Sequence, residues 1–182
     1  MKSLEEFKDF TQRVHSSYSL ANHSLELLAE KIQSADGYDN NENYKTLDDE
    51  SGQVISVIPN FHIIKGLKKD GPISQVIAHG LLSWVYFGWE NRFRPMIAKE
   101  LGVSNNEVMS DLMGDIKILR HKIAHNLGFL DKDIKKLKII NWLKQGHIIL
   151  KTDDMNKIQL KINNMDVYVS SNHSGGTPND AT

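Results

Sequence analysis

The sequence predicts an all-α protein, a helical bundle of four to five main helices with a short β element near the C-terminus. Three observations support this class. Apolar residues recur at helical spacing over several long segments, capping residues precede three of those segments, and 40% of the 182 residues are hydrophobic. A chain of this length and composition suits one domain with a core of its own.

The N-terminal part begins with a long helix. Apolar residues at mostly helical spacing predict it over residues 3–33. Residues 34–53 are polar and rich in turn formers, which predicts a loop. Residues 54–69 are ambiguous, because the first five suit a short strand while Pro59 interrupts any helix.

The central segment contains the helices expected to form the core, at about residues 72–145. One helix begins at Pro72, which suits a first turn, and continues to about Phe93, where Pro95 should end or kink it. A short helix follows over residues 96–101.

Capping signals predict where the next helices begin. The capping box at Ser104 starts a helix that reaches about Leu127 and stops at Gly128. Asp131 caps a further helix that continues to about Lys144.

The C-terminal part is expected to be mixed. A brief strand is predicted over residues 147–150 and a last helix after the capping residues at Thr152, with a β-hairpin as the competing interpretation of that helix. Residues 169–182 are predicted to be a disordered tail. Residues 1–168 are therefore expected to form the single domain.

The composition restricts the class of protein. There is no cysteine, which removes disulfides, thiolate nucleophiles and cysteine-based zinc sites. No apolar run approaches the ~18–20 residues that a membrane helix needs, and the acidic, helical N-terminus does not resemble a signal peptide. A Walker A loop and a convincing metal cluster are absent from the sequence, so we expect no cofactor and no metal. A cytoplasmic protein without membrane contact is the simplest expectation.

Charge is unevenly distributed, although the net charge is only −1. Residues 1–60 carry eleven acidic and five basic residues, whereas residues 117–138 carry seven basic and two acidic residues, a local net charge of +5. Local fields decide polyanion binding more than total charge does, so the second segment is a candidate contact for nucleic acid. A solvated helix face with i,i+4 ion pairs explains the same run equally well.

The helix that follows Ser104 has two distinct faces on a wheel of ~100° per residue. An apolar stripe faces the core and consists of Met109, Leu112, Ile116, Leu119 and Ile123. A second face, roughly opposite, consists of Gly114, Ile118, His121 and His125. Glycine inside a helix costs ~1 kcal/mol relative to alanine, which suggests that a partner helix or a ligand approaches closely at Gly114. A glycine without consequence for the fold is the alternative.

The most reactive pattern on this helix is an arginine and a histidine separated by four residues, Arg120 and His125. A guanidinium is always charged and holds a phosphate bidentately, while an imidazole titrates near neutrality and transfers protons. Together they suit cleavage of a phosphodiester without a metal. The alternative is that neither residue has a function: Arg120 is a surface arginine, and the helix dipole favours His125 at the helix C-terminus.

Arg120 and His125 do not point in the same direction. On a straight helix their side chains diverge by ~140°. Two copies of the helix, packed across a two-fold axis, bring groups from both subunits to one phosphate. The sequence therefore predicts a symmetric homodimer through the face formed by Gly114, Ile118, His121 and His125.

The segment from Leu119 to Asn126, Leu-Arg-His-Lys-Ile-Ala-His-Asn, resembles the Arg-polar-x3-His signature of the HEPN superfamily (higher eukaryotes and prokaryotes nucleotide-binding domain). Residues 111–116 and residues 89–95 on the preceding helix resemble the same family. The resemblance covers about residues 72–145. It implies a four- to five-helix bundle that dimerises, and a metal-independent endoribonuclease, often in toxin–antitoxin or antiphage systems.

The resemblance also implies roles for individual residues. Arg120 and His125 take the family's catalytic positions, and His121 takes the polar position beside the arginine. The 2′-hydroxyl of RNA attacks the phosphate and leaves a 2′,3′-cyclic phosphate, while His125 moves a proton and Arg120 neutralises the transition state. Substrate-binding residues are expected to be Lys117, Lys122 and Asn126. The expected partners are RNA, a second copy of the chain, and an antitoxin or other defence protein.

Several alternatives stay open. His121 and His125 have the spacing of zinc ligands, but the glutamate of a zincin helix and a third ligand are missing. A HEPN-type module that binds RNA, nucleotide or a protein partner without cleavage is the alternative function. A helical interaction protein with no role in nucleic acid binding is a third.

Neighbouring residues are expected to be structural. Glu90 and Arg94 should form an i,i+4 ion pair, unless Glu90 orients a histidine of the motif. The residues expected in the core are Trp84, Trp89, Trp142 and His79. Asp111 and Asp115 are expected to cap helices or to lie on the surface.

Overall fold

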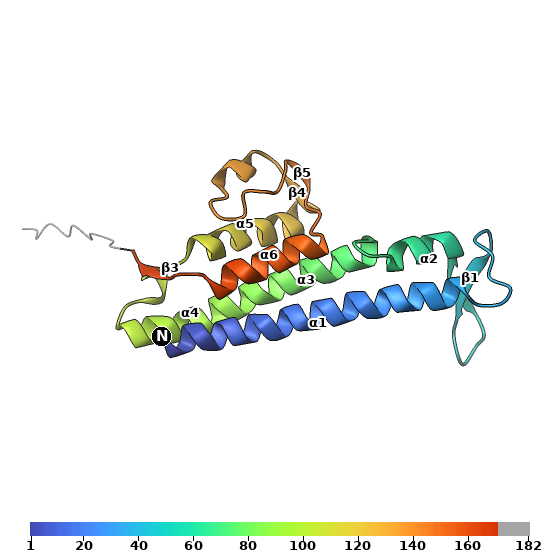
Figure 1. Ribbon diagram of the computed structural model, residues 1–182, viewed down its shortest axis with the longest axis horizontal. Coiled ribbons are helices and arrows are strands. Elements are labelled where there is room, and N and C mark those ends of the chain that lie inside the picture. Colours follow the sequence, from blue (N-terminus) through green and yellow to red (C-terminus); the bar gives the residue numbers. More distant parts are fainter. Residues whose placement is uncertain (171–182) are drawn as a thin grey trace, which may run out of the picture.

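The computed structural model describes residues 1–170 and is predominantly helical, which confirms the predicted class (Figure 1). The α-helices are α1 (Lys2–Gln33), α2 (Asn60–Leu67), α3 (Pro72–Gly88), α4 (Arg94–Leu101), α5 (Asp111–His125) and α6 (Thr152–Asn163). The strands are β1 (Asn43–Leu47), β2 (Val54–Pro59), β3 (Val108–Met109), β4 (Phe129–Leu130), β5 (Gly146–His147) and β6 (Tyr168–Val169). Shorter helical segments are the π-helix η1 (Trp89–Phe93) and the 3₁₀ helices η2 (Asn105–Glu107) and η3 (Lys132–Lys136).

Helix α1 runs along most of the length of the molecule, as Figure 1 shows. Its apolar residues recur at helical spacing, so that Phe7, Val14 and Tyr18 are all buried on one face. This face packs against α3 and α6, and the C-terminal part of α1 packs against α2. The helix predicted over residues 3–33 is confirmed.

Helices α3 and α4 continue into one another through η1, so the helical path does not stop near Phe93 as predicted. Pro95 lies in the first turn of α4, and the wider π turn before it accommodates a residue without a backbone N–H. At Gly88 a Cβ atom would lie 2.8 Å from Cε1 of Phe10, so the glycine leaves room for the Phe10 ring of α1 against α3.

Most buried apolar residues form one core between α1, α3, α4, α5 and α6. Phe7 of α1 and Ile162 of α6 belong to this core, so residues on both sides of the expected range 72–145 contribute to it. A smaller cluster around Ala29 and Ile64 joins the end of α1 to α2. Among residues 1–170, no helix combines the length and the apolar character that crossing a membrane requires.

Three small antiparallel sheets differ from the sequence-based expectation. β1 pairs with β2, with Asn43 opposite Pro59, so the segment over 34–53 predicted as a loop contains a strand. β3 pairs with β6, which places Val169 in a strand and corrects the start of the tail predicted over 169–182. Residues 171–182 of that tail lie outside the described residues. β4 pairs with β5. Strand β5 begins at Gly146, one residue before the strand predicted over residues 147–150, and ends at His147.

Two predicted helix starts are corrected. The Glu107 carboxylate accepts a hydrogen bond from the Ser104 N–H at 2.8 Å, but this box opens η2, and α5 begins only at Asp111. Asp131 caps only the short η3, and the helix predicted to continue to Lys144 does not form. After η3 the chain bends and turns instead of continuing as a helix, because a buried carboxylate of α5 binds its backbone N–H groups, as described below. The last helix, α6, is confirmed, and the competing hairpin interpretation is wrong.

Candidate functional site

Helix α5 carries the Arg120–His125 motif on the surface of the molecule, and His125 is its last residue. The residues that hold α5 against the core, each at most 3% exposed, are Leu112, Ile116 and Leu119. Ile123 is partly buried beside them. Met109, predicted to extend this stripe, lies instead on β3 and is 38% exposed, since α5 starts two residues later.

The second face of α5 is uncovered in a single chain. Gly114, His121 and His125 are exposed, and Ile118 is half-buried. A Cβ atom on Gly114 would meet no atom of residues 1–170 within 4 Å, so no described part of the same chain makes the close approach inferred from this glycine. The ring centroids of His121 and His125 lie 4.8 Å apart, and neither ring forms a hydrogen bond with any group in residues 1–170.

Two hollows in the surface meet at Tyr86 and Arg120. The first, which we name the aromatic hollow, has a volume of about 500 Å³ and is lined by Ser83, Trp84, Tyr86, Phe87, Glu90, Asn91 and Arg120. The second, which we name the basic hollow, has a volume of about 300 Å³ and is lined by Tyr86, Lys117, Ile118, Arg120, His121, Lys122, Asp133 and Lys136. The structure therefore brings α3, η1 and α5 together around Arg120, while His125 lines neither hollow.

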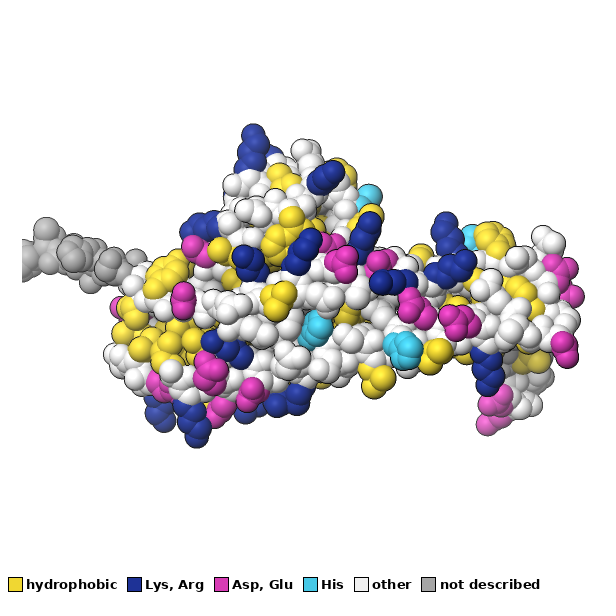
Figure 2. Space-filling model, in the orientation of Figure 1, with side chains coloured by type: hydrophobic (Ala, Val, Ile, Leu, Met, Phe, Trp, Pro, Cys, Tyr) yellow, Lys and Arg dark blue, Asp and Glu magenta, His cyan; other side chains and the backbone are white. Residues whose placement is uncertain are grey.

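The free positive charges of the site belong to Lys117 and Arg120. Both are exposed, and no carboxylate in residues 1–170 forms an ion pair with either one. Figure 2 shows lysine and arginine side chains over α5 and the segment that follows it, with several acidic side chains at the end formed by β1 and β2. Asn126 is exposed directly after α5, where its carbonyl accepts a hydrogen bond from the Phe129 N–H at 2.9 Å.

Lys122 does not lie free on the surface, as a substrate-binding role would require. Its side chain is only 7% exposed, and its ammonium lies 3.1 Å from Asp131 and 2.6 Å from Asp133. Hydrogen bonds to Asp133 and Asp131 raise the pKa of Lys122. The hydrogen bond from Lys122, together with a second from Lys136, lowers the pKa of Asp133 to about 2. Lys122 thus fastens the segment after α5, and part of the local positive charge is neutralised.

Tyr86 and Arg94 hold Glu90 between them. The Tyr86 phenol donates to a Glu90 oxygen at 3.2 Å, and Arg94 donates to the other oxygen at 3.0 Å, which confirms the predicted ion pair. Arg94 also donates to the Val108 carbonyl at 2.9 Å and so ties α4 to β3. Burial, with the neighbouring Glu90 charge, raises the pKa of Tyr86 to about 12. Tyr86 is therefore a neutral hydrogen-bond donor, and Glu90 faces the aromatic hollow rather than a histidine.

The aromatic residues expected in the core are divided between core and surface. Trp89 is 3% exposed and Trp142 packs partly buried against the core, as predicted. Trp84 is 56% exposed, so its core prediction is wrong. His79 is half-buried with Nε2 3.0 Å from the Ile148 carbonyl, and burial lowers its pKa.

A helical wheel of α3 contains the signal that places Trp84 outside. The buried stripe of this helix continues into η1 with spacings of four, three and four residues and consists of Ala78, Leu82, Val85 and Trp89. Trp84 and Phe87 fall outside this stripe, and Phe87 is 62% exposed. The aromatic hollow could therefore be anticipated in part from the sequence, although its partner Arg120 could not.

Asp115 has a structural role that the sequence did not indicate. Its side chain is buried, and its carboxylate accepts hydrogen bonds from the backbone N–H groups of Lys138, Ile139 and Ile140 at 3.0, 2.7 and 2.7 Å. The expectation of a cap or a surface residue is therefore wrong. These bonds hold the bent segment after η3 against α5. N–H groups that donate to Asp115 cannot donate to the carbonyls of a continuing helix.

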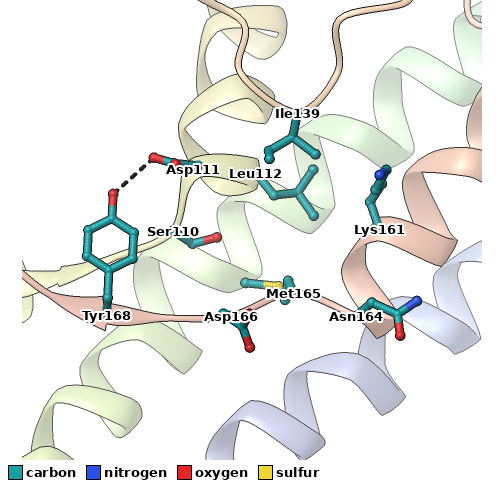
Figure 3. Close-up of a pocket in the computed structure, with 9 residues that line it drawn as sticks. All are labelled: Ser110, Asp111, Leu112, Ile139, Lys161, Asn164, Met165, Asp166 and Tyr168. Carbon is teal, nitrogen blue, oxygen red and sulfur yellow. Dashed lines mark hydrogen bonds between the residues drawn. The ribbon is translucent and has the colours of Figure 1, made fainter.

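A further pocket of about 350 Å³ lies beside the N-terminus of α5 and contains no residue of the motif (Figure 3). It is lined by Ser110, Asp111, Leu112, Ile139, Lys161, Asn164, Met165, Asp166 and Tyr168. Asp111 accepts a hydrogen bond from the Tyr168 hydroxyl at 2.9 Å and another from Lys138 at 2.7 Å. These contacts hold β6 beside α5, so we interpret this pocket as a structural junction.

Within the part of the chain that the structure describes, no three His, Asp or Glu side chains gather closely enough to hold a metal ion. The chain matches no known family model, and no curated protein or solved structure is significantly similar to it. Function has therefore to be inferred from the site itself.

Proposed function

We propose that this chain is a metal-independent endoribonuclease of the HEPN type, which cleaves RNA by attack of the 2′-hydroxyl on the adjacent phosphate. One observation carries the proposal. Arg120 lies where two hollows meet and has no ion-pair partner within residues 1–170, and the exposed His121–His125 pair follows it on the same helix. A guanidinium that binds phosphate, beside imidazoles that transfer protons, supplies the groups that such a cleavage needs.

The proposed reaction needs one base and one acid. The 2′-hydroxyl attacks phosphorus and gives its proton to His125, while the bond between phosphorus and the 5′-oxygen breaks. His121, which lines the basic hollow together with Arg120, gives a proton to the leaving 5′-oxygen. The products are a 2′,3′-cyclic phosphate and a 5′-hydroxyl, and no water is consumed.

The basic hollow is the proposed phosphate site. Arg120 neutralises the charge that grows on the phosphate oxygens in the transition state, and Lys117 adds a second free positive charge beside it. Lys122 lines the same hollow, but its charge is already paired, so we assign it no contact with substrate.

We further propose that the active form is a homodimer through the exposed face of α5. Arg120 and His125 leave one helix in directions ~140° apart, and His125 lines neither hollow of its own chain. A second copy across a two-fold axis supplies the missing histidine to each phosphate site. The open surface at Gly114 leaves room for this approach.

The Gly114→Ala variant tests this interface. In one chain the added methyl group meets open space, so we expect the free energy of unfolding to stay unchanged or to rise by up to ~1 kcal/mol. In the dimer the methyl group enters the contact between two helices and should raise the dimer dissociation constant. Sedimentation equilibrium measures the association, and thermal unfolding measures the stability. Unchanged dimerisation, or a monomeric wild type, contradicts the proposed interface.

The cleavage proposal predicts activity in excess EDTA. We expect the purified protein to cut mixed cellular RNA under these conditions and to leave 2′,3′-cyclic phosphate ends. Such ends resist a phosphatase and accept a 3′-end label only after polynucleotide kinase removes the cyclic phosphate. A DNA of the same sequence should stay intact because it lacks the nucleophile. RNA with 2′-O-methyl groups should also stay intact, and cleavage of that RNA would show that the mechanism is wrong.

A HEPN-type module that binds RNA, nucleotide or a partner such as an antitoxin without cleavage is the second candidate. The observation that favours it is the absence of His125 from both hollows, since binding at Arg120 does not require that histidine. RNA binding that survives His125→Ala, in a protein that never cleaves, would establish the binding module instead.

A further inference from the structure

We propose that the aromatic hollow holds one unpaired base of the RNA, a guanine, next to the phosphate bound at Arg120. This inference rests on the proposed function, because it assigns the base that accompanies the phosphate. It identifies the substrate class as single-stranded RNA.

The exposed aromatic residues support a stacked base. Trp84 and Phe87 lie one turn apart on α3 and are 56% and 62% exposed. Phe10 of α1 packs edge-on against Trp84, with ring centroids 6.3 Å apart and an angle of 75° between the rings, and so supports one side of the indole. Preformed aromatic side chains beside a basic surface are the usual platform for unpaired bases, whereas bases inside a duplex cannot reach them.

The polar groups of the hollow are mainly acceptors. The Ser83 hydroxyl donates its proton to the His79 carbonyl at 2.9 Å, which leaves its oxygen as an acceptor. The Asn91 amide nitrogen donates to the Phe87 carbonyl at 3.0 Å, while no group in residues 1–170 donates to its oxygen. Three hydrogen bonds to Glu90 leave part of the acceptor capacity of its carboxylate unused.

These acceptors of the aromatic hollow complement guanine better than they complement the other bases. The Watson–Crick edge of guanine presents two neighbouring N–H donors, which suit Glu90 and Asn91. No other RNA base presents two adjacent N–H donors on this edge, and Arg120, at the margin of the same hollow, stays with the phosphate. The charge of the neighbouring basic hollow also favours a polyanion over a second protein surface, because Lys117 and Arg120 have no acidic partner among the described residues.

The test measures binding, not cleavage, so its result does not depend on the nuclease proposal. Fluorescent 2′-O-methyl hexamers, identical except for one central base, are titrated with the full chain and followed by anisotropy. We expect the hexamer with guanine to bind most tightly and a blunt RNA duplex to bind more weakly than any single strand. We expect Trp84→Ala to weaken binding of the guanine hexamer by about 5- to 100-fold and to remove the preference.

Two variants make the test specific. Trp84→Phe keeps an aromatic face and should restore most of the affinity. Val76→Ala removes a side chain that is 72% exposed on the same helix, outside the hollow, and should change nothing. Equal affinity for all four hexamers overturns the proposal, as does unchanged binding by Trp84→Ala. A Trp84→Ala variant that binds RNA normally but no longer dimerises would show that a second copy of the chain covers the hollow.

Discussion

Replacement of His125 by alanine is expected to reduce RNA cleavage by about 10²–10⁴-fold, because it removes the group proposed to take the proton from the 2′-hydroxyl. Replacement of Arg120 by alanine should reduce the rate by about 10²–10³-fold through loss of transition-state stabilisation. Both side chains are exposed and have no partner among the described residues, so neither change should alter the melting temperature. Single-turnover cleavage of a defined RNA in EDTA measures both effects.

Matched variants separate chemistry from charge and from folding. Arg120→Lys keeps the positive charge but loses the planar fork that binds phosphate bidentately, so we expect it to restore only part of the rate. His23→Ala removes an exposed histidine on α1, far along the chain from the motif, and should leave cleavage unchanged. Full activity in His125→Ala would exclude this residue from the reaction and favour a different nuclease site.

Replacement of Asp115 by alanine is expected to lower the free energy of unfolding by about 3–5 kcal/mol. The change leaves three backbone N–H groups without their acceptor: that of Ile140 is in a buried hydrogen bond, and those of Lys138 and Ile139 are in part-buried ones. Thermal unfolding should show a melting temperature lower by roughly 10 °C.

Two controls define the cause. Asp115→Asn keeps the shape of the side chain but points an amide N–H₂ at N–H donors, so it should also destabilise the protein clearly. Asp111→Ala removes a carboxylate of the same helix whose partners, Lys138 and Tyr168, reach solvent, so its effect should be much smaller. Equal melting temperatures for Asp115→Ala and Asp111→Ala would contradict the role assigned to Asp115.

Elements with a complete local signal were predictable from the sequence. The apolar spacing of residues 3–33 and the acidic residues that follow Thr152 correspond to α1 and to the first turn of α6 in the structure. The exposed face of α5 with His121 and His125 also followed from residue spacing alone. In each case the residues that decide the structure lie within a few positions of one another.

Elements that depend on distant residues were missed. The segment after Asp131 has the apolar spacing of a helix, yet Asp115, more than twenty positions earlier, takes up the N–H groups that the helix would use. Strand β3 interrupts the predicted start of α5 because Val108 pairs with Val169 near the other end of the chain. A capping box reports only that a helical turn begins, not how long it continues.

For the candidate site, the sequence by itself determined the chemistry available on α5: an arginine, two histidines one turn apart, and a glycine on the same helix. Only the tertiary structure decided which of these groups are free. Packing of the segment after α5 buries Lys122 between two carboxylates, while packing of α3 beside α5 places Trp84, Tyr86 and Glu90 next to Arg120. The physical reason is that burial and charge pairing depend on side chains brought together by folding, whereas helical facing depends only on spacing along the chain.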